Sequence, residues 1–276
     1  MEEEEEMSFL QHLEVLRWHL IRSIFAILVG AVTIFIAKSF VFDSIIFAPK
    51  NEDFITFRFL CWVSAHLANW LPFIFSSDTI CIGRDLPQLQ NIHMTGQFMT
   101  HILVSLVGGL IIAFPYLIWE VWRFIRPGLK KKEQRYAGGI VILTSLLFMT
   151  GVLFGYYVIT PLSVNFFLSY SISSSVSTIP TLSTYISTVV TVVLACGFVF
   201  QLPNLVYFLA KAGIISAKAM RAYRKHAFVG ALILSAVITP PDVFSQILVS
   251  LPLVVLYELS IFIARRIEKK AEDPQE

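Results

Sequence analysis

The stretch FMTHILVSLVGGLIIAFPYLIWEVWRF, residues 98–124, decides the fold class of this chain. A helix needs about 20 mostly apolar residues to cross a hydrocarbon core of about 30 Å, and this stretch exceeds that length. Three further stretches meet the same criterion, at residues 18–42, 137–160 and 182–209. We therefore expect an all-α protein that crosses a membrane several times.

The composition of the 276-residue chain agrees with that expectation. Hydrophobic residues make up 56% and charged residues 14%, whereas soluble domains have roughly 45–50% and about 25%. The small net charge of +2 argues against a dedicated nucleic-acid binder. The three cysteines form no CxxC pair and the six histidines form no HExxH motif, so we expect neither a metal site nor another cofactor.

The last apolar stretch is interrupted by Pro240-Pro241-Asp242. Proline removes a backbone donor and a carboxylate is costly in lipid, so we divide the stretch into spans at residues 227–239 and 243–264. This gives six transmembrane helices, the last two joined at the turn Thr239-Pro240-Pro241-Asp242. The fifth span would reach only about 20 Å, which predicts a locally thinned membrane beside it.

The basic residues predict the orientation of these spans. Seventeen of the 21 lysine and arginine residues lie in or beside the N-terminal segment, the loops after the second and fourth spans, and the tail after the sixth. Segments rich in lysine and arginine tend to stay in the cytoplasm, so both termini should be cytoplasmic. The acidic residues 2–6 differ from the basic start of a cleaved secretory signal, so the first span should remain as an anchor. We expect one membrane domain, residues 1–276, with a cytoplasmic tail at 265–276.

An enlarged exterior segment, residues 43–97, separates the first two spans and has room for short interfacial helices. Cys61 and Cys81 both lie in this segment, on the oxidising side of the membrane, where disulfides persist. The sequence alone leaves their pairing open, because pairing depends on how closely the two Cα atoms approach.

Several polar side chains fall at membrane depth, where each needs a partner, a cavity or a function. Gln201 lies inside the fourth span, and its amide can bond another helix or the carbonyl that Pro203 frees. Asp242 and Gln246 share one face of the sixth span, although Asp242 is also well placed to cap that helix.

Two further carboxylates lie near basic segments. Glu258 falls close to the cytoplasmic interface, where Arg265 or a neighbouring loop would supply its partner. Glu133 follows the cationic residues 130–132, and taken alone it reads as a surface salt bridge worth less than about 1 kcal/mol.

Motifs along nearly the whole chain resemble the TatC family, the membrane receptor subunit of the twin-arginine protein translocase. They occur in the family's order on a six-span frame, and Thr239 to Gln246 is the most specific of them. The motifs are His12-Leu13-Glu14-Val15-Leu16-Arg17, Ala48-Pro49, the stretch from Pro115 through Arg126-Pro127-Gly128-Leu129 to Glu133, Phe200-Gln201-Leu202-Pro203, and Thr239-Pro240-Pro241-Asp242-Val243-Phe244-Ser245-Gln246.

The resemblance implies that the chain binds signal peptides with two adjacent arginines on its cytoplasmic face. A guanidinium group is planar, permanently charged and matched to a carboxylate fork. Glu133 matches the family's main signal-binding glutamate, and Phe124 matches the aromatic residue beside it. Glu14 and Arg17 complete the implied site, although Val15 stands where family members commonly carry a glutamate.

The resemblance also implies partners and an energy source. Gln201 stands where some members have glutamate, so we expect it to receive a polar residue of a single-span TatA or TatB subunit. The chain would be a receptor and assembly platform of a multimeric complex in the bacterial inner membrane, not an enzyme. The proton-motive force would drive export of folded proteins, because the chain has no Walker A sequence. The residues expected to form a partner-subunit site or an intramembrane polar site are Gln201, Pro203, Thr239, Asp242, Gln246 and Glu258.

Two other functional classes are weighed against this one. A secondary transporter for a small solute would use Gln201, Asp242 and Glu258 as a midplane site, but no internal repeat is visible. An intramembrane hydrolase would need a nucleophile and a base at matching depth. His101 lies in the second predicted span, and no catalytic motif accompanies it.

Overall fold

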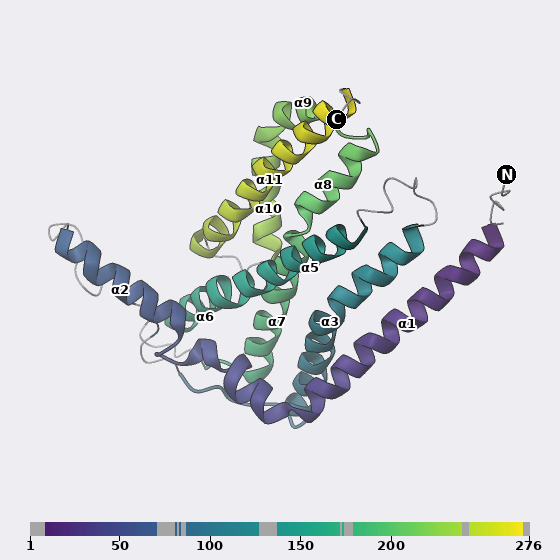
Figure 1. Ribbon diagram of the computed structural model, residues 1–276. Coiled ribbons are helices and arrows are strands. Elements are labelled where there is room, and N and C mark those ends of the chain that lie inside the picture. The colour runs from purple at the N-terminus through teal and green to yellow at the C-terminus, as the bar shows by residue number, and fades with distance from the viewer. Residues whose placement is uncertain are drawn as a thin grey trace. The chain divides into compact units, whose positions relative to one another are not determined.

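The computed structural model describes residues 9–70, 81, 83, 87–126, 137–171, 173, 179–238 and 243–272. Within these ranges the regular structure is helical, apart from an isolated bridge between Gln90 and Thr181 (Figure 1). Four of the described segments are long and apolar enough to cross a membrane, namely Leu13–Ile36, Gly96–Ile125, Gly138–Ser169 and Leu182–Lys211. They coincide with the first four predicted spans, so the all-helical, multi-pass prediction is confirmed.

The last two predicted spans correspond to helices α10 (Arg224–Ile238) and α11 (Val243–Glu272). The turn Thr239-Pro240-Pro241-Asp242 lies outside the described residues. The number of six spans and the cytoplasmic placement of both termini stay predictions. Helix α11 continues as far as Glu272, so most of the expected tail is helical.

The chain groups into two compact units, which we describe separately. Unit 1 comprises Met1–Lys38 and His101–Leu146, and unit 2 comprises Ser39–Thr100 and Leu147–Glu276. One boundary lies between Lys38 and Ser39, and the other two fall inside helices α3 (Gly96–Ile125) and α5 (Ala137–Phe154). That residues 1–276 form one membrane domain stays a prediction.

In unit 1, helix α1 (Phe9–Ile36) packs against the larger part of α3, and the two helices approach closely at Gly30 and Gly109. A Cβ atom added to Gly109 would lie 2.4 Å from the backbone nitrogen of Ala31, and one added to Gly30 would lie 2.9 Å from the Gly109 oxygen. Small residues let membrane helices approach closely, because packing drives their association. The crossing holds the two helices together, so side chains elsewhere on their facing surfaces can meet.

In unit 2, the part of α5 from Leu147 onward passes through the π-helical turn η4 (Gly155–Ile159) into α6 (Thr160–Ser169). Helix α7 (Leu182–Val199) packs on this segment, and a Cβ atom added to Gly151 would lie 2.5 Å from the Cys196 oxygen. The buried core of this region consists of Ile159, Val192, Cys196, Ile238, Val249 and Leu253.

The predicted fourth span is two helices. Helix α7 ends at Val199, and α8 (Leu202–Lys211) begins after Phe200 and Gln201. Pro203 lies in the first turn of α8, a position proline favours because its missing N–H would have no helical partner there. The same ring disfavours a continuous helix through this point.

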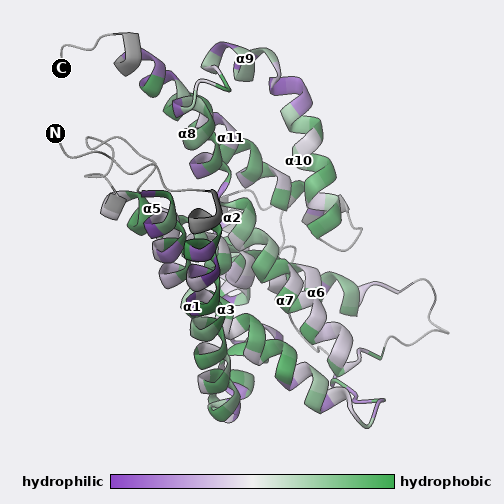
Figure 2. Ribbon diagram, turned by 90° about the vertical axis from the view of Figure 1, so that its right-hand side faces the viewer, coloured by the Kyte–Doolittle hydropathy of each residue, from purple (hydrophilic) through white to green (hydrophobic). Residues whose placement is uncertain are grey.

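Helices α8, α9 (Ala217–Ala222), α10 and α11 lie side by side in unit 2 (Figures 1 and 2). The Tyr257 hydroxyl of α11 donates to the Met220 oxygen of α9 at 2.9 Å. The Glu268 carboxylate accepts from the Ala217 amide at the start of α9 at 2.7 Å. Buried apolar side chains fill the space between these helices, namely Val206, Ala210, Ala217, Met220, Ile261 and Ala264.

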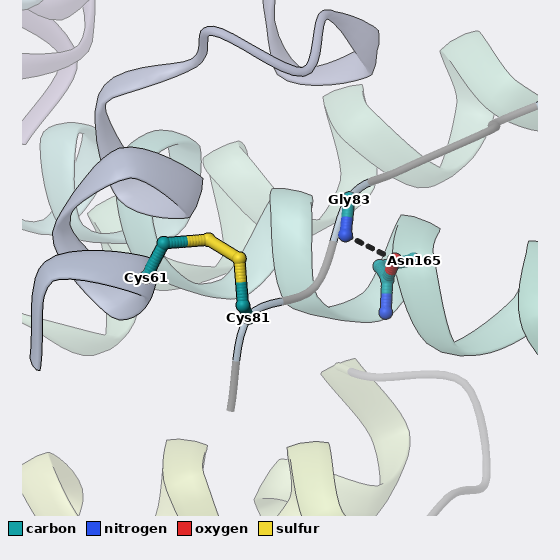
Figure 3. The surroundings of a disulfide bond; sticks show 4 residues. All are labelled: Cys61, Cys81, Gly83 and Asn165. Carbon is teal, nitrogen blue, oxygen red and sulfur yellow. Dashed lines mark hydrogen bonds between the residues drawn. A yellow bond between two sulfur atoms is a disulfide. The ribbon is translucent and has the colours of Figure 1, made fainter. Parts of the chain in front are cut away.

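The predicted exterior segment contains the turns η1 (Phe40–Ile46) and η2 (Ala48–Lys50), followed by helix α2 (Ile55–Trp70). Cys61 of α2 forms a disulfide with Cys81, with Cα atoms 4.3 Å apart (Figure 3). Two residues later the Gly83 amide donates to Asn165 Oδ1 of α6 at 3.0 Å (Figure 3). Gly83 has a φ of +95° and lies against the Phe57 ring, where a side chain would clash. The disulfide therefore holds Cys81 against α2, and the hydrogen bond holds Gly83 against α6.

Candidate functional site

A buried carboxylate in α3 is the centre of the polar cluster in unit 1. Glu120 is only 1% exposed, although it belongs to a candidate membrane span. Its Oε2 atom is hydrogen-bonded to His19 Nδ1 from α1, and its Oε1 atom accepts from the Tyr116 hydroxyl at 2.8 Å. Ionisable groups at membrane depth persist when they are paired in this way. Both carboxylate oxygens are therefore engaged, one by α1 and one by α3.

Phe124, the aromatic residue predicted to contact the signal peptide, belongs to the same cluster. Its ring lies edge-on to the His19 ring, with centroids 6.0 Å apart and an interplanar angle of 67°. Glu120 and Phe124 are four residues apart and so share one face of α3. Phe124 is half-buried, so part of this residue remains accessible. The imidazole that binds Glu120 thus also packs against Phe124.

Glu14 and Arg17, the other predicted signal-binding residues that the structure describes, occupy a different face of α1. Both are exposed, whereas Val15 and His19 are half-buried. Successive helical residues are about 100° apart, so positions 15 and 19 point together while 14 and 17 point away from them. Glu14 and Arg17 are therefore directed away from the cluster around Glu120.

Three predicted site residues, Glu133, Thr239 and Asp242, lie outside the described residues. The roles assigned to them stay predictions. Phe124 is the closest described member of the predicted signal site to Glu133 in the sequence, and α3 ends directly after it at Ile125.

The polar residues predicted for a partner site in unit 2 occupy separate positions. Gln201 is half-buried at the break between α7 and α8, beside the buried Pro203. Gln246 Nε2 donates to the Leu232 oxygen of α10 at 3.2 Å. Glu258 lies twelve residues further along α11, about 18 Å by helical rise. Gln246 and Glu258 therefore belong to different local environments.

The partner of Glu258 is Arg224, at the start of α10. Arg224 Nη2 and Glu258 Oε2 are 2.7 Å apart, and the two side chains are 52% and 46% exposed. We expected either Arg265 or a neighbouring loop to bind Glu258. The structure shows that Arg224, from the neighbouring basic segment, binds it. Such an exposed pair contributes little to stability.

The sequence interpretation passed over His19 and Glu120. Glu120 stands in the aromatic stretch at the end of the second predicted span, and His19 follows the first motif. The available signal was the position of Glu120, a carboxylate inside an otherwise apolar stretch. Among the described residues, no group of three His, Cys, Asp or Glu side chains could hold a metal ion.

Comparison with known proteins connects this arrangement to a family. Residues 11–252 match the family model described as Sec-independent protein translocase protein (TatC). The chain belongs to the TatC family. The TatC of Blattabacterium sp. subsp. Periplaneta americana is 38% identical over 270 residues, covering 97% of this chain and 98% of that relative. The TatC of Desulforapulum autotrophicum is 35% identical over 274 residues, covering 99% and 90%.

Solved TatC structures are similar to this chain along nearly their whole length. The crystal structure of the twin-arginine translocase receptor TatC superposes with a TM-score of 0.64 at 32% identity, covering 93% of this chain and 99% of that one. The resemblance read from the sequence motifs is thus confirmed. Membership of a protein translocase family does not favour the small-solute transporter alternative.

Proposed function

We propose that this chain is a twin-arginine signal-peptide receptor and the core subunit of a Tat translocase in the bacterial inner membrane. The observation that carries the proposal is the placement of Phe124, which the pair of His19 and Glu120 supports at the end of α3. Phe124 is half-buried and precedes Glu133 by nine residues in the sequence. The TatC crystal structure described as a twin-arginine translocase receptor supports the same reading.

In the proposed recognition, a carboxylate and an aromatic ring both contact the arginines of the signal peptide. Glu133 binds a signal-peptide guanidinium through two charge-assisted hydrogen bonds. The Phe124 ring offers a face on which a guanidinium group can stack. Glu120 does not take an arginine in this scheme, because both of its oxygens are engaged inside unit 1. Glu14 and Arg17 would contact the peptide from the exposed face of α1.

The chain also acts, in this proposal, as an assembly platform for single-span TatA or TatB subunits. In this proposal a polar residue of a partner helix packs at the break between α7 and α8, where Gln201 is half-buried. Two other residues of the proposed polar site are bonded within unit 2, Gln246 to the Leu232 oxygen of α10 and Glu258 to Arg224. The proton-motive force supplies the energy, and the complex acts without enzymatic chemistry.

Export of a twin-arginine reporter by a Glu133→Ala variant tests the proposal. Losing a bidentate carboxylate contact should weaken signal-peptide binding about 10- to 100-fold. We expect export to fail while the variant accumulates normally in the membrane. Glu133→Asp, which keeps the carboxylate, should retain part of the activity, and a twin-lysine reporter should be exported poorly by the unaltered chain. Normal export by Glu133→Ala would overturn the assignment.

A further inference from the structure

A cavity of about 330 Å³ opens in unit 2 where α9, α10 and α11 meet. Figure 2 colours the first turn of α10 and the last turns of α11 as hydrophilic, in contrast to the apolar middle of each helix. Three guanidinium groups and one carboxylate leave the cavity with a net positive charge. Its lining residues are Arg221, Arg224, Glu258, Ile261, Phe262 and Arg265.

The described carboxylates of this region are already engaged. Glu258 binds Arg224 at 2.7 Å, and Glu268 accepts from the Ala217 amide at 2.7 Å. Arg221 and Arg265 form no ion pair with any carboxylate that the structure describes. These two guanidinium groups are therefore available to an anion from outside the chain.

An apolar stripe leads along α11 to the cavity. Leu251, Val255, Leu259 and Phe262 follow one another at spacings of three or four residues, which places them on one helix face. All four are at least 50% exposed. From Leu251 to Phe262 the stripe measures about 16 Å by helical rise, close to half of a hydrocarbon core of about 30 Å.

We propose that Arg221 and Arg265 bind the phosphate of an anionic phospholipid, such as phosphatidylglycerol, whose acyl chains lie along the stripe on α11. Guanidinium groups bind phosphate oxygens through paired hydrogen bonds. Basic pockets between membrane helices suit such head groups, and each basic residue near the surface adds attraction to them. A free anion would use the arginines but has no use for the stripe. The site is built from residues of unit 2 alone and does not depend on the proposed function.

Native mass spectrometry of the full chain, released from bilayers that mix phosphatidylglycerol with phosphatidylcholine, tests the site. Removing the two groups that hydrogen-bond the phosphate, with Arg221→Gln and Arg265→Gln, should weaken phosphatidylglycerol binding about 30-fold. The matched control, Lys218→Gln with Lys225→Gln, removes the same charge from α9 and α10 outside the cavity lining. It should change binding less than about threefold.

Several outcomes would contradict the proposed phospholipid site. Unchanged phosphatidylglycerol binding by the arginine variant would do so, and so would an equal loss in the lysine control, which would indicate diffuse surface charge. Displacement of the lipid by millimolar inorganic phosphate alone would indicate a free-anion site. Crosslinks from Leu259 to a single-span subunit, with lipid excluded, would assign the stripe to a partner helix. If the arginine variant is unstable, Arg221→Lys with Arg265→Lys keeps the charge and should still reduce binding several-fold, because the planar fork is lost.

Discussion

Replacing Glu120 with alanine should loosen the contact between α1 and α3. The substitution removes the acceptor for His19 from α1 and for the Tyr116 hydroxyl from α3. Because Glu120 is 1% exposed, water cannot easily take the place of the lost carboxylate. His19 would also lose the partner that orients its ring against Phe124.

The expected magnitude follows from the two bonds. Hydrogen bonds to charged groups contribute about 1.5–3 kcal/mol in soluble proteins. Interhelical polar contacts in membranes average only about 0.6 kcal/mol and reach about 1.7, because polar groups of the unfolded state also find partners within the membrane. We therefore expect Glu120→Ala to lower the free energy of unfolding by about 1–3 kcal/mol. Glu120→Gln keeps the shape and one acceptor, so its cost should be below about 1 kcal/mol.

A double-mutant cycle isolates the pair. Unfolding of Glu120→Ala, His19→Ala and the double variant would be followed in detergent micelles by tryptophan fluorescence. We expect a coupling energy of about 0.6–1.7 kcal/mol. The exposed pair of Arg224 and Glu258 is the matched comparison and should give about 0.2–1 kcal/mol. If Glu120→Ala costs the same with and without His19, the interhelical bond makes no contribution and the reasoning is refuted.

Two further predictions concern packing and covalent structure. Gly109→Leu should destabilise unit 1 by about 1–3 kcal/mol, because its side chain would meet the Ala31 backbone. Thermal unfolding would show it, and Gly139→Ala, which adds a methyl group where no atom lies within 4 Å, should not lower stability. Reduction of the bond between Cys61 and Cys81, separated by 20 residues, should cost about 3 kcal/mol locally and speed proteolysis after α2. Equal proteolysis of oxidised and reduced protein would contradict this.

The helices could be predicted because a segment in lipid must satisfy its own backbone hydrogen bonds, and its apolar length is visible in the sequence. A run such as residues 98–124 must be helical to satisfy its backbone in hydrocarbon, whatever its neighbours are. The break in the fourth span was less visible, although Pro203 was recognised, because a proline near a helix end is compatible with a kink or with a new helix start. The structure decides for two helices, α7 and α8.

Part of the candidate site could be predicted from the sequence, and part depends on the tertiary structure. Phe124 was identified from its motif, since the order of residues along the chain is enough to recognise it. The opposite orientations of Glu14 and His19 depend on which face of α1 turns toward α3. Gly30 and Gly109 set that face through a close approach between segments far apart in sequence.

The sequence by itself determined the membrane environment, the family motifs and the helical segments, because each depends on local composition or order. The tertiary structure alone decided which polar groups meet. Glu120 finds His19 101 residues away, and Arg224 rather than Arg265 binds Glu258. Hydrogen bonds and ion pairs form between atoms a few ångströms apart, and only the packing of helices brings such distant positions that close.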